Sequence, residues 1–510
     1  MDVGFLFEHS VERYPDHTAL VFEERRWSYR AWHQRVQRCA QALFDLGVGS
    51  GDRVALYLQT SEVSVSAYFA VQLLGAVAVP LNYRLAAGEA AHILEDSGSS
   101  VLIYDASLCE STRKAQQLAR GVREFLCYAD AQTDIPAGHL DFETLLESTG
   151  DRTEPWPARS ASQLSALMYT SGTTGRAKGV MHSHANDVAI AMNCVMEYGL
   201  QHQDIALHIA PLYHVGGLQA FFIPHLMVGA TNVVLSRYSA ASTLAAITQE
   251  RITTLFAVPT QIRELLLQER LQGIEPWSLR MITTGGAALS AASMARVQRE
   301  LCTQIYNGYG MTEASLTLLL HPQDALRQLG SCGKPTLISA CRILAAAGEV
   351  GQLLVQGPQV TCGYWNNPHE TAAKIKHGWL YTGDLFSTDE QGFYYFRGRI
   401  DDMIVSGGEN IYPREVEEVL YRCAGVQQAA VIGLPDAKWG AVVTAFVVRE
   451  GDLTAESLDR HCRESTELAA FKRPRRFVFL EQLPTNPSGK VLKRQLLADY
   501  GPSPDEAATI

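Results

Sequence analysis

The sequence lacks the features that mark exported, disulfide-linked or zinc-binding proteins. Its 10 cysteines are scattered, with no CxxC pair and no His/Cys spacing typical of a zinc site. The N-terminus, MDVGFLFEHSVERYP, has charges inside its first apolar stretch, which is atypical of a signal peptide. We therefore expect reduced thiols and a cytoplasmic protein.

The sequence is also poor in charge, and its net charge is negative. Charged residues make up 19% of the chain and the formal net charge is −11, whereas hydrophobic residues reach 47%. That composition is ordinary for a folded soluble protein. No basic stripe suggests nucleic acid, and the densest cationic cluster, Lys472 to Arg476, is more typical of a solvated face than of a phosphate site. We expect no nucleic-acid partner.

One long stretch has no acidic or basic residue. Ile205 to Ser236 contains no Asp, Glu, Lys or Arg and is long enough to span a bilayer. It is interrupted, however, by Pro211, Pro224 and three histidines. A transmembrane span is the alternative, but the interruptions favour a buried strand–turn–helix–strand passage. We therefore predict no integral membrane span.

Length and hydrophobic patterning predict an α/β protein of several parts. A chain of 510 residues is too long for one compact core. Short apolar runs alternate with helical stretches, which is typical of parallel sheets. The runs are 53–58, 77–81, 100–104, 231–235, 254–258, 281–284 and 303–306. From Gly333 onward glycine turns become frequent, as in a small antiparallel β region.

We therefore predict a large N-terminal domain, residues 1–399, made of two α/β subdomains and a small β region. A small α+β C-terminal domain, residues 400–510, is expected to follow. Within it, Arg414 to Cys423 has apolar residues on one helical face, and 429–432 and 442–448 have the character of strands.

The stretch YTSGTTGRAKGV, from Tyr169 to Val180, combines hydroxyls, glycines and a lysine with little apolar bulk. Glycine lets a backbone approach a ligand closely, and hydroxyls, amides and a cation together suit a polyphosphate. An apolar run before it and a helical stretch from Val188 predict strand, glycine-rich turn and helix, the usual arrangement of a phosphate site. Because Ala177 precedes Lys178, the pattern is not the commonest phosphate loop, and a plain surface loop remains the alternative.

Four further motifs follow in order along the chain. They are NGYGMTE from Asn307 to Glu313, YTGD from Tyr381 to Asp384, GRIDDMIVSGGENIYP from Gly398 to Pro413, and NPSGK from Asn486 to Lys490. Together with the glycine-rich loop, and in this order, they resemble the acyl-adenylating superfamily, which includes acyl-CoA synthetases, stand-alone adenylation domains and beetle luciferases. The resemblance covers essentially the whole chain.

The resemblance implies a reaction in two halves, with ATP, Mg²⁺ and coenzyme A. A carboxylate attacks the α-phosphate of ATP, which gives an acyl-adenylate and pyrophosphate. A thiol, usually that of coenzyme A, then attacks the acyl carbonyl and expels AMP. Since the first half brings two anions together, the protein must supply cations and donors where charge builds up.

The resemblance also assigns a nucleotide site. The loop from Thr170 to Lys178 is expected to hold the β- and γ-phosphates. Glu313 is expected to bind Mg²⁺, and Thr312 to donate to the α-phosphate. Tyr309 is expected to stack on adenine, with a core tyrosine as the alternative. The whole expected ATP and AMP site is Thr170, Ser171, Gly172, Thr173, Thr174, Gly175, Lys178, Gly286, Ala287, Asn307, Gly308, Tyr309, Gly310, Met311, Asp384 and Arg399.

Two catalytic roles come from the same resemblance. Lys490 is expected to bridge the attacking carboxylate and the α-phosphate; the alternative is a solvated surface lysine. His214 lies in an apolar run, where a lone histidine is usually a core residue, but its motif resembles a gate beside the substrate carboxylate and the thiol tunnel. Asp384 is expected to accept from the ribose hydroxyls, with Arg399 beside that ribose.

The resemblance further implies a mobile C-terminal domain and a coenzyme A site. The hinge is expected near 399–402, with Asp401 as the pivot. The domain is expected to use Lys490 for adenylation and then rotate, so that the segment from Ser406 lines the thiol tunnel. The expected coenzyme A contacts are Ser406, Gly407, Gly408, Trp439, Phe471, Arg473 and Arg84.

The acid itself is only partly specified. Amino-acid-activating relatives place an aspartate near this histidine, but Val215 to Phe221 contains no acid. We therefore expect a fatty or aromatic carboxylic acid as substrate. A ligase that loads a carrier protein's phosphopantetheine and a non-catalytic nucleotide-binding relative are the competing hypotheses, and a homodimer is left open.

Overall fold

The computed structural model describes residues 1–129, 133–150, 152, 154–171, 176–268, 278–286, 289, 291–302, 304–346, 349–436, 438–465, 468–485 and 491–501. The chain divides into two compact units. Unit 1 comprises Met1–Leu329, Gly333–Ala340 and Val355–Leu380. Unit 2 comprises Gly330–Cys332, Cys341–Leu354 and Tyr381–Ile510.

Unit 1 contains two large sheets, counted over its described residues. The first is eight-stranded, in the order β19-β9-β8-β4-β3-β5-β6-β7. Its strands are β3 (Arg53–Tyr57), β4 (Val77–Pro80), β5 (Val101–Asp105), β6 (Glu124–Tyr128), β7 (Leu140–Asp141), β8 (Leu164–Ser171), β9 (Ala177–Ser183) and β19 (Gly363–Tyr364). From β8 to β7 neighbouring strands are parallel, while β9 is antiparallel to both β8 and β19.

The second sheet is nine-stranded over the same described part, in the order β16-β15-β14-β13-β12-β10-β11-β1-β2. Its strands are β1 (Thr18–Phe22), β2 (Arg25–Ser28), β10 (Ile205–His208), β11 (Thr231–Val234), β12 (Thr254–Phe256), β13 (Met281–Gly285), β14 (Ile305–Met311), β15 (Ser315–Leu320) and β16 (Lys334–Pro335). The strands from β14 to β1 run parallel, and the outer pairs are antiparallel.

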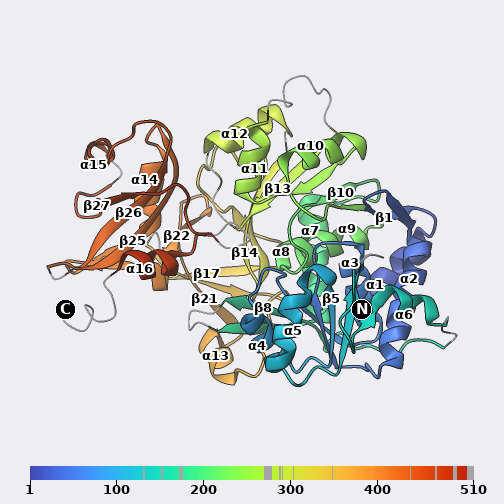
Figure 1. Cartoon of the computed structure of the whole chain (residues 1–510). Coiled ribbons are helices and arrows are strands. Elements are labelled where there is room, and N and C mark those ends of the chain that lie inside the picture. The colour runs from blue at the N-terminus through green and yellow to red at the C-terminus, as the bar shows by residue number, and fades with distance from the viewer. Residues whose placement is uncertain are drawn as a thin grey trace. The chain divides into compact units, whose positions relative to one another are not determined.

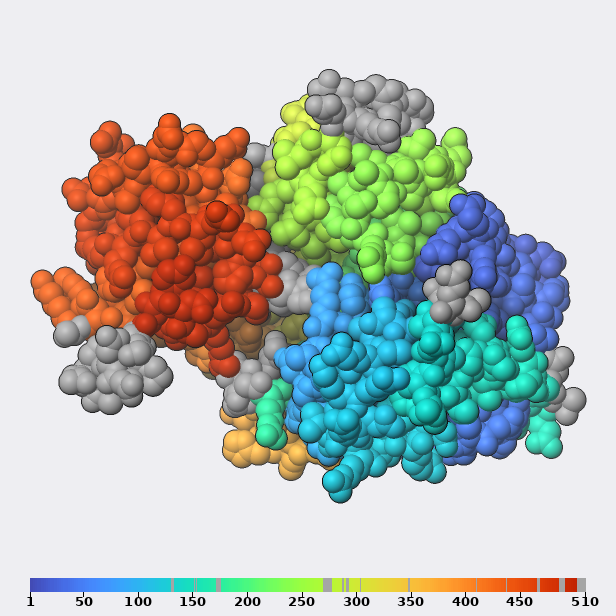
Figure 2. All heavy atoms as spheres, in the orientation of Figure 1, coloured from blue at the N-terminus to red at the C-terminus, as the bar shows by residue number. Residues whose placement is uncertain are grey.

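Most helices of unit 1 lie between strands of the two sheets, since parallel neighbours need a crossover connection (Figure 1). They are α1 (Val3–Arg13), α2 (Tyr29–Asp45), α3 (Glu62–Leu73), α4 (Ala87–Ser97), α5 (Cys109–Leu118), α6 (Phe142–Ser148), α7 (His184–Tyr198), α8 (Val215–Gly217), η2 (Leu218–Phe222), α9 (Ile223–Met227), α10 (Ala240–Gln249), α11 (Pro259–Leu266), α12 (Ala291–Glu300) and α13 (Pro368–Lys374). In Figure 2 the residues coloured blue to cyan make up a continuous, closely packed surface.

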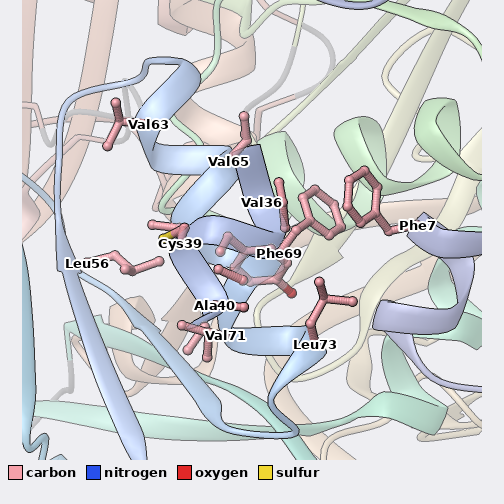
Figure 3. Close-up of a cluster of buried hydrophobic side chains, with 14 of the residues drawn as sticks. Phe7, Val36, Cys39, Ala40, Leu56, Val63, Val65, Phe69, Val71 and Leu73 are labelled. Carbon is pink, nitrogen blue, oxygen red and sulfur yellow. The ribbon is translucent and has the colours of Figure 1, made fainter. Parts of the chain in front are cut away.

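The main core of unit 1 joins α1, α2 and α3 to the strands beneath them. Phe7, Trp32 and Phe69 are fully buried, and their rings pack edge to face or stacked at centroid distances of 4.9 to 5.5 Å. Figure 3 shows Phe69 of α3 between Phe7 and Val36. Because such aromatic side chains bury large apolar areas, this cluster fixes the helices against the sheets that carry the functional motifs.

Unit 2 is built on smaller sheets. The order β17-β18-β21-β20, with β22 beside β21, spans the chain from 340 to 399, and two more sheets lie in the C-terminal part. The strands of these sheets are β17 (Ala340–Leu344), β18 (Gly351–Gln356), β20 (Ile375–Lys376), β21 (Trp379–Thr388), β22 (Tyr394–Arg399), β23 (Ile404–Ser406), β24 (Glu409–Ile411), β25 (Val426–Asp436), β26 (Gly440–Arg449) and β27 (Arg476–Phe479). Of these, β20 and single ends of β17, β18 and β21 are counted with unit 1, and the rest belongs to unit 2. Its helices are α14 (Pro413–Tyr421), α15 (Ala455–Glu464) and α16 (Lys493–Tyr500).

The predicted α/β class, with a large N-terminal part and a small α+β C-terminal part, is confirmed. The uncharged stretch from Ile205 is the expected strand–turn–helix–strand passage from β10 through α8, η2 and α9 to β11. Over the described residues, no helix is both long and apolar enough to cross a membrane. The domain boundary at 399/400 and the hinge remain predictions.

Candidate active site

The glycine-rich stretch forms the end of a β-hairpin. Thr170 of β8 lies opposite Lys178 of β9 in an antiparallel pair. The expected arrangement of strand, turn and helix is therefore wrong in one respect: a second strand, β9, stands between the loop and α7. Four expected phosphate ligands, Gly172, Thr173, Thr174 and Gly175, lie outside the described residues, as does the side chain of Ser171.

The base of this hairpin is hydrogen-bonded to α4. The hydroxyl of Tyr169 donates to Asp96 Oδ2 at 2.6 Å, and His92 Nε2 lies 3.1 Å from the carbonyl oxygen of Ala177. Burial, together with the nearby Asp96 carboxylate, raises the pKa of Tyr169, so the phenol keeps its proton. These bonds hold both strands at the point where the loop begins.

Lys178 is ion-paired. Its ammonium nitrogen lies 2.9 Å from Glu370 Oε1, and the two side chains are only 12% and 21% exposed. Glu370 lies in the first turn of α13, whose N-terminus is capped by Asn367. The expected phosphate ligand therefore has a carboxylate partner that the sequence did not reveal.

The motif from Asn307 to Met311 is the end of strand β14 rather than a loop after a strand. Close backbone contacts explain Gly310 of this motif and Gly285 of the neighbouring strand β13. A Cβ at Gly310 would lie 2.1 Å from the carbonyl oxygen of Ser315, and one at Gly285 would lie 2.6 Å from the carbonyl oxygen of Gly308. Gly286, just after β13, has a φ of 81°, which favours glycine. Ala287 lies outside the described residues, while Asn307 and Tyr309 are half-buried on β14.

Thr312 and Glu313 occupy the turn between β14 and β15. The hydroxyl of Tyr364 donates to Glu313 Oε1 at 2.8 Å, and the backbone amide of Thr361 donates to the Glu313 carbonyl oxygen at 2.8 Å. A neutral phenol orients the carboxylate without neutralising its charge. A half-buried carboxylate of this kind fits the hard-cation ligand expected for Mg²⁺, which in proteins often has one or two carboxylates and phosphate oxygens around it.

His214 precedes a short helix and caps it. Its Nδ1 accepts from the backbone amide of Gly216 at 3.2 Å, which requires the hydrogen of the neutral ring to be on Nε2. His214 is an exposed residue, yet the protein atoms around its ring displace water from it, and this desolvation lowers the pKa of the ring. Phe256 lies against Gly216, where a Cβ would be 3.3 Å from the ring. A neutral histidine thus stands beside an apolar surface.

In unit 2, Asp384 and Arg399 form a cross-strand pair. They are directly opposite in β21 and β22, and Arg399 Nε lies 3.1 Å from Asp384 Oδ1. Thr382 accepts from the backbone amide of Asp384 at 3.0 Å, which fixes the strand at this point. The two residues expected near the ribose are therefore brought together.

The expected thiol-tunnel residues lie in a β-hairpin of unit 2. Ser406 ends β23, and Gly407 and Gly408 form its turn with φ values of 59° and 87°. Two successive positive φ angles are typical of a type I′ turn. The backbone amide of Gly407 donates to the carbonyl oxygen of Trp439 at 2.8 Å, so Trp439 is brought against this turn. The predicted hinge residue, Asp401, lies exposed in the 3₁₀ turn η4 (Ile400–Asp402).

The remaining expected coenzyme A residues differ in their surroundings. Phe471 is 44% exposed, whereas Arg473 is ion-paired with Asp459. In unit 1, Arg84 is exposed, with its guanidinium 5.4 Å from the centroid of the Tyr83 ring. Lys490, the expected catalytic lysine, lies outside the described residues.

Sequence reasoning missed the residues that hold the site in place. Glu370, Tyr364 and Asp96 each bind a motif residue from a distant part of the chain. Asp187 was also missed. Its signal was an acidic residue directly before the apolar run Val188 to Met192, on the buried side of a helix.

Comparison with known proteins agrees with this geometry. The family model of the AMP-binding enzyme matches residues 7–365, and that of the AMP-binding enzyme C-terminal domain matches 415–490. The chain belongs to the AMP-dependent acyl- and aryl-CoA synthetase family of acyl-adenylating enzymes. The resemblance inferred from the motifs, and the enzyme class it implied, are confirmed.

Several relatives span nearly the same length as this synthetase. A feruloyl-CoA synthase of Amycolatopsis sp is 36% identical over 495 residues, which cover 96% of both chains. An indoleacetate–CoA ligase of Aromatoleum aromaticum is 36% identical, covering 95% and 96%. The o-succinylbenzoate CoA synthetase MenE from Bacillus subtilis, solved with its acyl-adenylate intermediate, is 32% identical with a TM-score of 0.85, covering 96% and 97%.

Proposed function

We propose that this synthetase joins a carboxylic acid with an apolar body to coenzyme A. In the first half-reaction the carboxylate oxygen bonds to the α-phosphorus of ATP, and pyrophosphate leaves with the electron pair. In the second, the coenzyme A sulfur bonds to the acyl carbon, the bond to AMP breaks, and the thiol proton passes to a base. The observation that carries the proposal is the Thr312–Glu313 turn, held by Tyr364 beside a glycine-lined strand end.

Residue roles follow from chemistry and resemblance together. Lys178 and the hydroxyl-rich loop bind the β- and γ-phosphates, Thr312 donates to the α-phosphate, and Glu313 holds Mg²⁺. Bound there, the cation neutralises charge on the phosphate oxygens. Asp384 accepts from the ribose hydroxyls. Binding of ATP and magnesium by a relative supports this assignment, since the Bacillus subtilis MenE was solved in complex with both.

The acid is proposed to be aromatic or fatty. Support comes from the segment after His214, which carries no ionisable group as far as Phe221 and lies against the ring of Phe256. Curated relatives are named for feruloyl-CoA, indoleacetate, 2-succinylbenzoate and long-chain fatty acids. All are named as CoA ligases or CoA synthases, which favours coenzyme A over a carrier protein as acceptor.

A substrate panel tests the proposal. Purified enzyme is given ATP, Mg²⁺ and one acid at a time, with and without coenzyme A, and pyrophosphate and AMP are measured. Ferulate, indoleacetate, 2-succinylbenzoate and a long-chain fatty acid are matched with glycine and phenylalanine as amino-acid controls. We expect turnover that requires coenzyme A with at least one acid of the first set. Turnover confined to the amino acids would refute the proposal. So would transfer of the acyl group to the phosphopantetheine thiol of an added carrier protein, with release of AMP, when coenzyme A is not accepted.

A further inference from the structure

A buried carboxylate, Asp187, lies at the centre of a polar network that the roles above do not use. It follows the N-terminal cap of α7 and has no exposed surface. Its Oδ2 accepts from Ser165 Oγ at 2.6 Å, and its Oδ1 accepts from Gln219 Nε2 at 2.7 Å. Since a buried carboxylate is strongly destabilising without such donors, these bonds determine where Asp187 can lie.

His182 extends the network to the nucleotide motif. The imidazole has no exposed surface, and its Nδ1 lies 3.5 Å from Asp187 Oδ1, a close contact that is not a hydrogen bond. Its Nε2 lies 2.9 Å from the carbonyl oxygen of Thr312. Because a carbonyl oxygen only accepts, Nε2 carries a hydrogen and donates it. The ring therefore stands between the Asp187 carboxylate and the backbone of the turn that bears Glu313.

The network joins four segments that are far apart in the sequence. Ser165 and His182 lie on β8 and β9, the two strands that end in the glycine-rich loop. Thr312 lies in the turn between β14 and β15, and Gln219 lies shortly after His214. No solvent reaches Asp187, His182 or Gln219, and hydrogen bonds are stronger in such a low-dielectric interior.

The segment that carries Gln219 has an unusual helical form. Leu218–Phe222 is a π-helix, a conformation often found at functional sites. His225 holds it, because Nδ1 lies 2.7 Å from the Phe221 carbonyl oxygen while Nε2 lies 2.9 Å from Thr254 Oγ1. The carbonyl can only accept, so Nδ1 donates. This bond anchors the π-helix two residues after Gln219.

We propose that Asp187 and His182 are positioning residues for adenylate formation. They hold the Thr312 carbonyl, and with it the Thr312–Glu313 turn, at a fixed orientation to the segment that bears His214. The inference rests on the proposed adenylation, in which Thr312 and Glu313 meet the phosphates. The positioning role is confined to the first half-reaction. A small displacement of a phosphate ligand lowers the rate of phosphoryl transfer, but it leaves thioester formation from a supplied adenylate unaffected.

Two substitutions at one position make the test. His182→Leu removes the donor to Thr312, and His182→Gln keeps an N–H at comparable reach. With an acid from the panel, we expect His182→Leu to lower kcat of acid-dependent pyrophosphate–ATP exchange about tenfold or more. Thioester formation from supplied acyl-adenylate, and KM for the acid, should stay within about threefold of the wild type. His182→Gln should recover most of the lost exchange.

The outcomes are separable. The inference is overturned if His182→Leu exchanges pyrophosphate at the wild-type rate. It is also overturned if both half-reactions are lost equally, or if His182→Gln is as slow as His182→Leu. If His182→Leu does not melt cooperatively, Gln219→Met takes its place with the same expected split, and wild-type exchange by that variant overturns it. Failure of the wild-type protein to exchange pyrophosphate with any acid would refute the proposed function instead.

Discussion

The ion pair between Lys178 and Glu370 predicts that removing a carboxylate will strengthen ATP binding. Glu370→Gln keeps the size of the side chain and removes its negative charge. Lys178 then loses the anion that competes with phosphate for its ammonium group. A carboxylate this close to the proposed phosphate loop also repels the phosphates directly, so both effects have the same sign.

The magnitude follows from the pair's geometry. The two charged atoms are 2.9 Å apart, and the side chains are 12% and 21% exposed, so the pair is screened less than a surface ion pair. Exposed pairs contribute about 0–1 kcal/mol and charged hydrogen bonds about 1.5–3 kcal/mol. We therefore expect the loss of the Glu370 charge to strengthen ATP binding by about 1–2 kcal/mol, which corresponds to a dissociation constant about 5- to 30-fold lower.

Calorimetric titration with ATP and Mg²⁺, without acid, measures this change. Glu250→Gln is a matched control, because Glu250 is also 21% exposed and is ion-paired with Arg26 of β2, an edge strand of the nine-stranded sheet in the described chain. The control should bind ATP as the wild type does. Weaker binding by Glu370→Gln would refute the reasoning, since it would mean that the pair serves only to shape the hairpin.

Four further predictions follow from the site and the fold. Lys490→Ala should abolish adenylate formation and spare thioester formation from added acyl-adenylate; a joint loss of both in stopped-flow assays would remove its assignment. Asp384→Ala should raise the dissociation constant for ATP by the equivalent of about 1.5–3 kcal/mol, with coenzyme A affinity unchanged in the same titrations. Asp401→Pro should slow thioester formation far more than adenylation in single-turnover measurements, because proline fixes φ, and equal slowing would exclude this pivot. Burial holds the pKa of His225 at about 4, below the ordinary 6.5. Between pH 6.5 and pH 4 the unfolded state therefore binds more protons than the folded state, so the free energy of unfolding decreases as the pH falls through this range. The loss is about 2 kcal/mol by pH 5, and urea titrations of His225→Gln should show a flatter pH dependence.

Much of the fold could be predicted because its strands are short apolar runs between helices. The runs at 53–58, 77–81 and 100–104 are the parallel strands β3, β4 and β5. The helix after the glycine-rich loop was expected from Val188 but begins at His184. Ser183 and Asn186 cap it reciprocally, and the residues before it pair with β8 as β9. Strand β9 was missed because its residues are partly polar, so the sequence contains no apolar run that would indicate a strand there.

Site residues could be proposed from the sequence where one short motif carries the chemistry, and their roles stay predictions. The residues around Thr312 and Asp384 could be assigned from their motifs by resemblance alone. Their partners could not, because Tyr364 and Glu370 become neighbours of the motifs only when distant segments pair. Hydrogen bonds over such sequence distances are set by sheet order and leave no local pattern.

The most direct test of the account is to isolate its intermediate. Enzyme in excess over ATP is mixed with Mg²⁺ and the best acid of the panel, without coenzyme A, and the products are identified by mass spectrometry. The account predicts acyl-adenylate and pyrophosphate in equal amounts, and conversion of that adenylate to acyl-CoA and AMP when coenzyme A is added. Formation of acyl-CoA with ADP and phosphate, or an adenylate that coenzyme A does not consume, would contradict it.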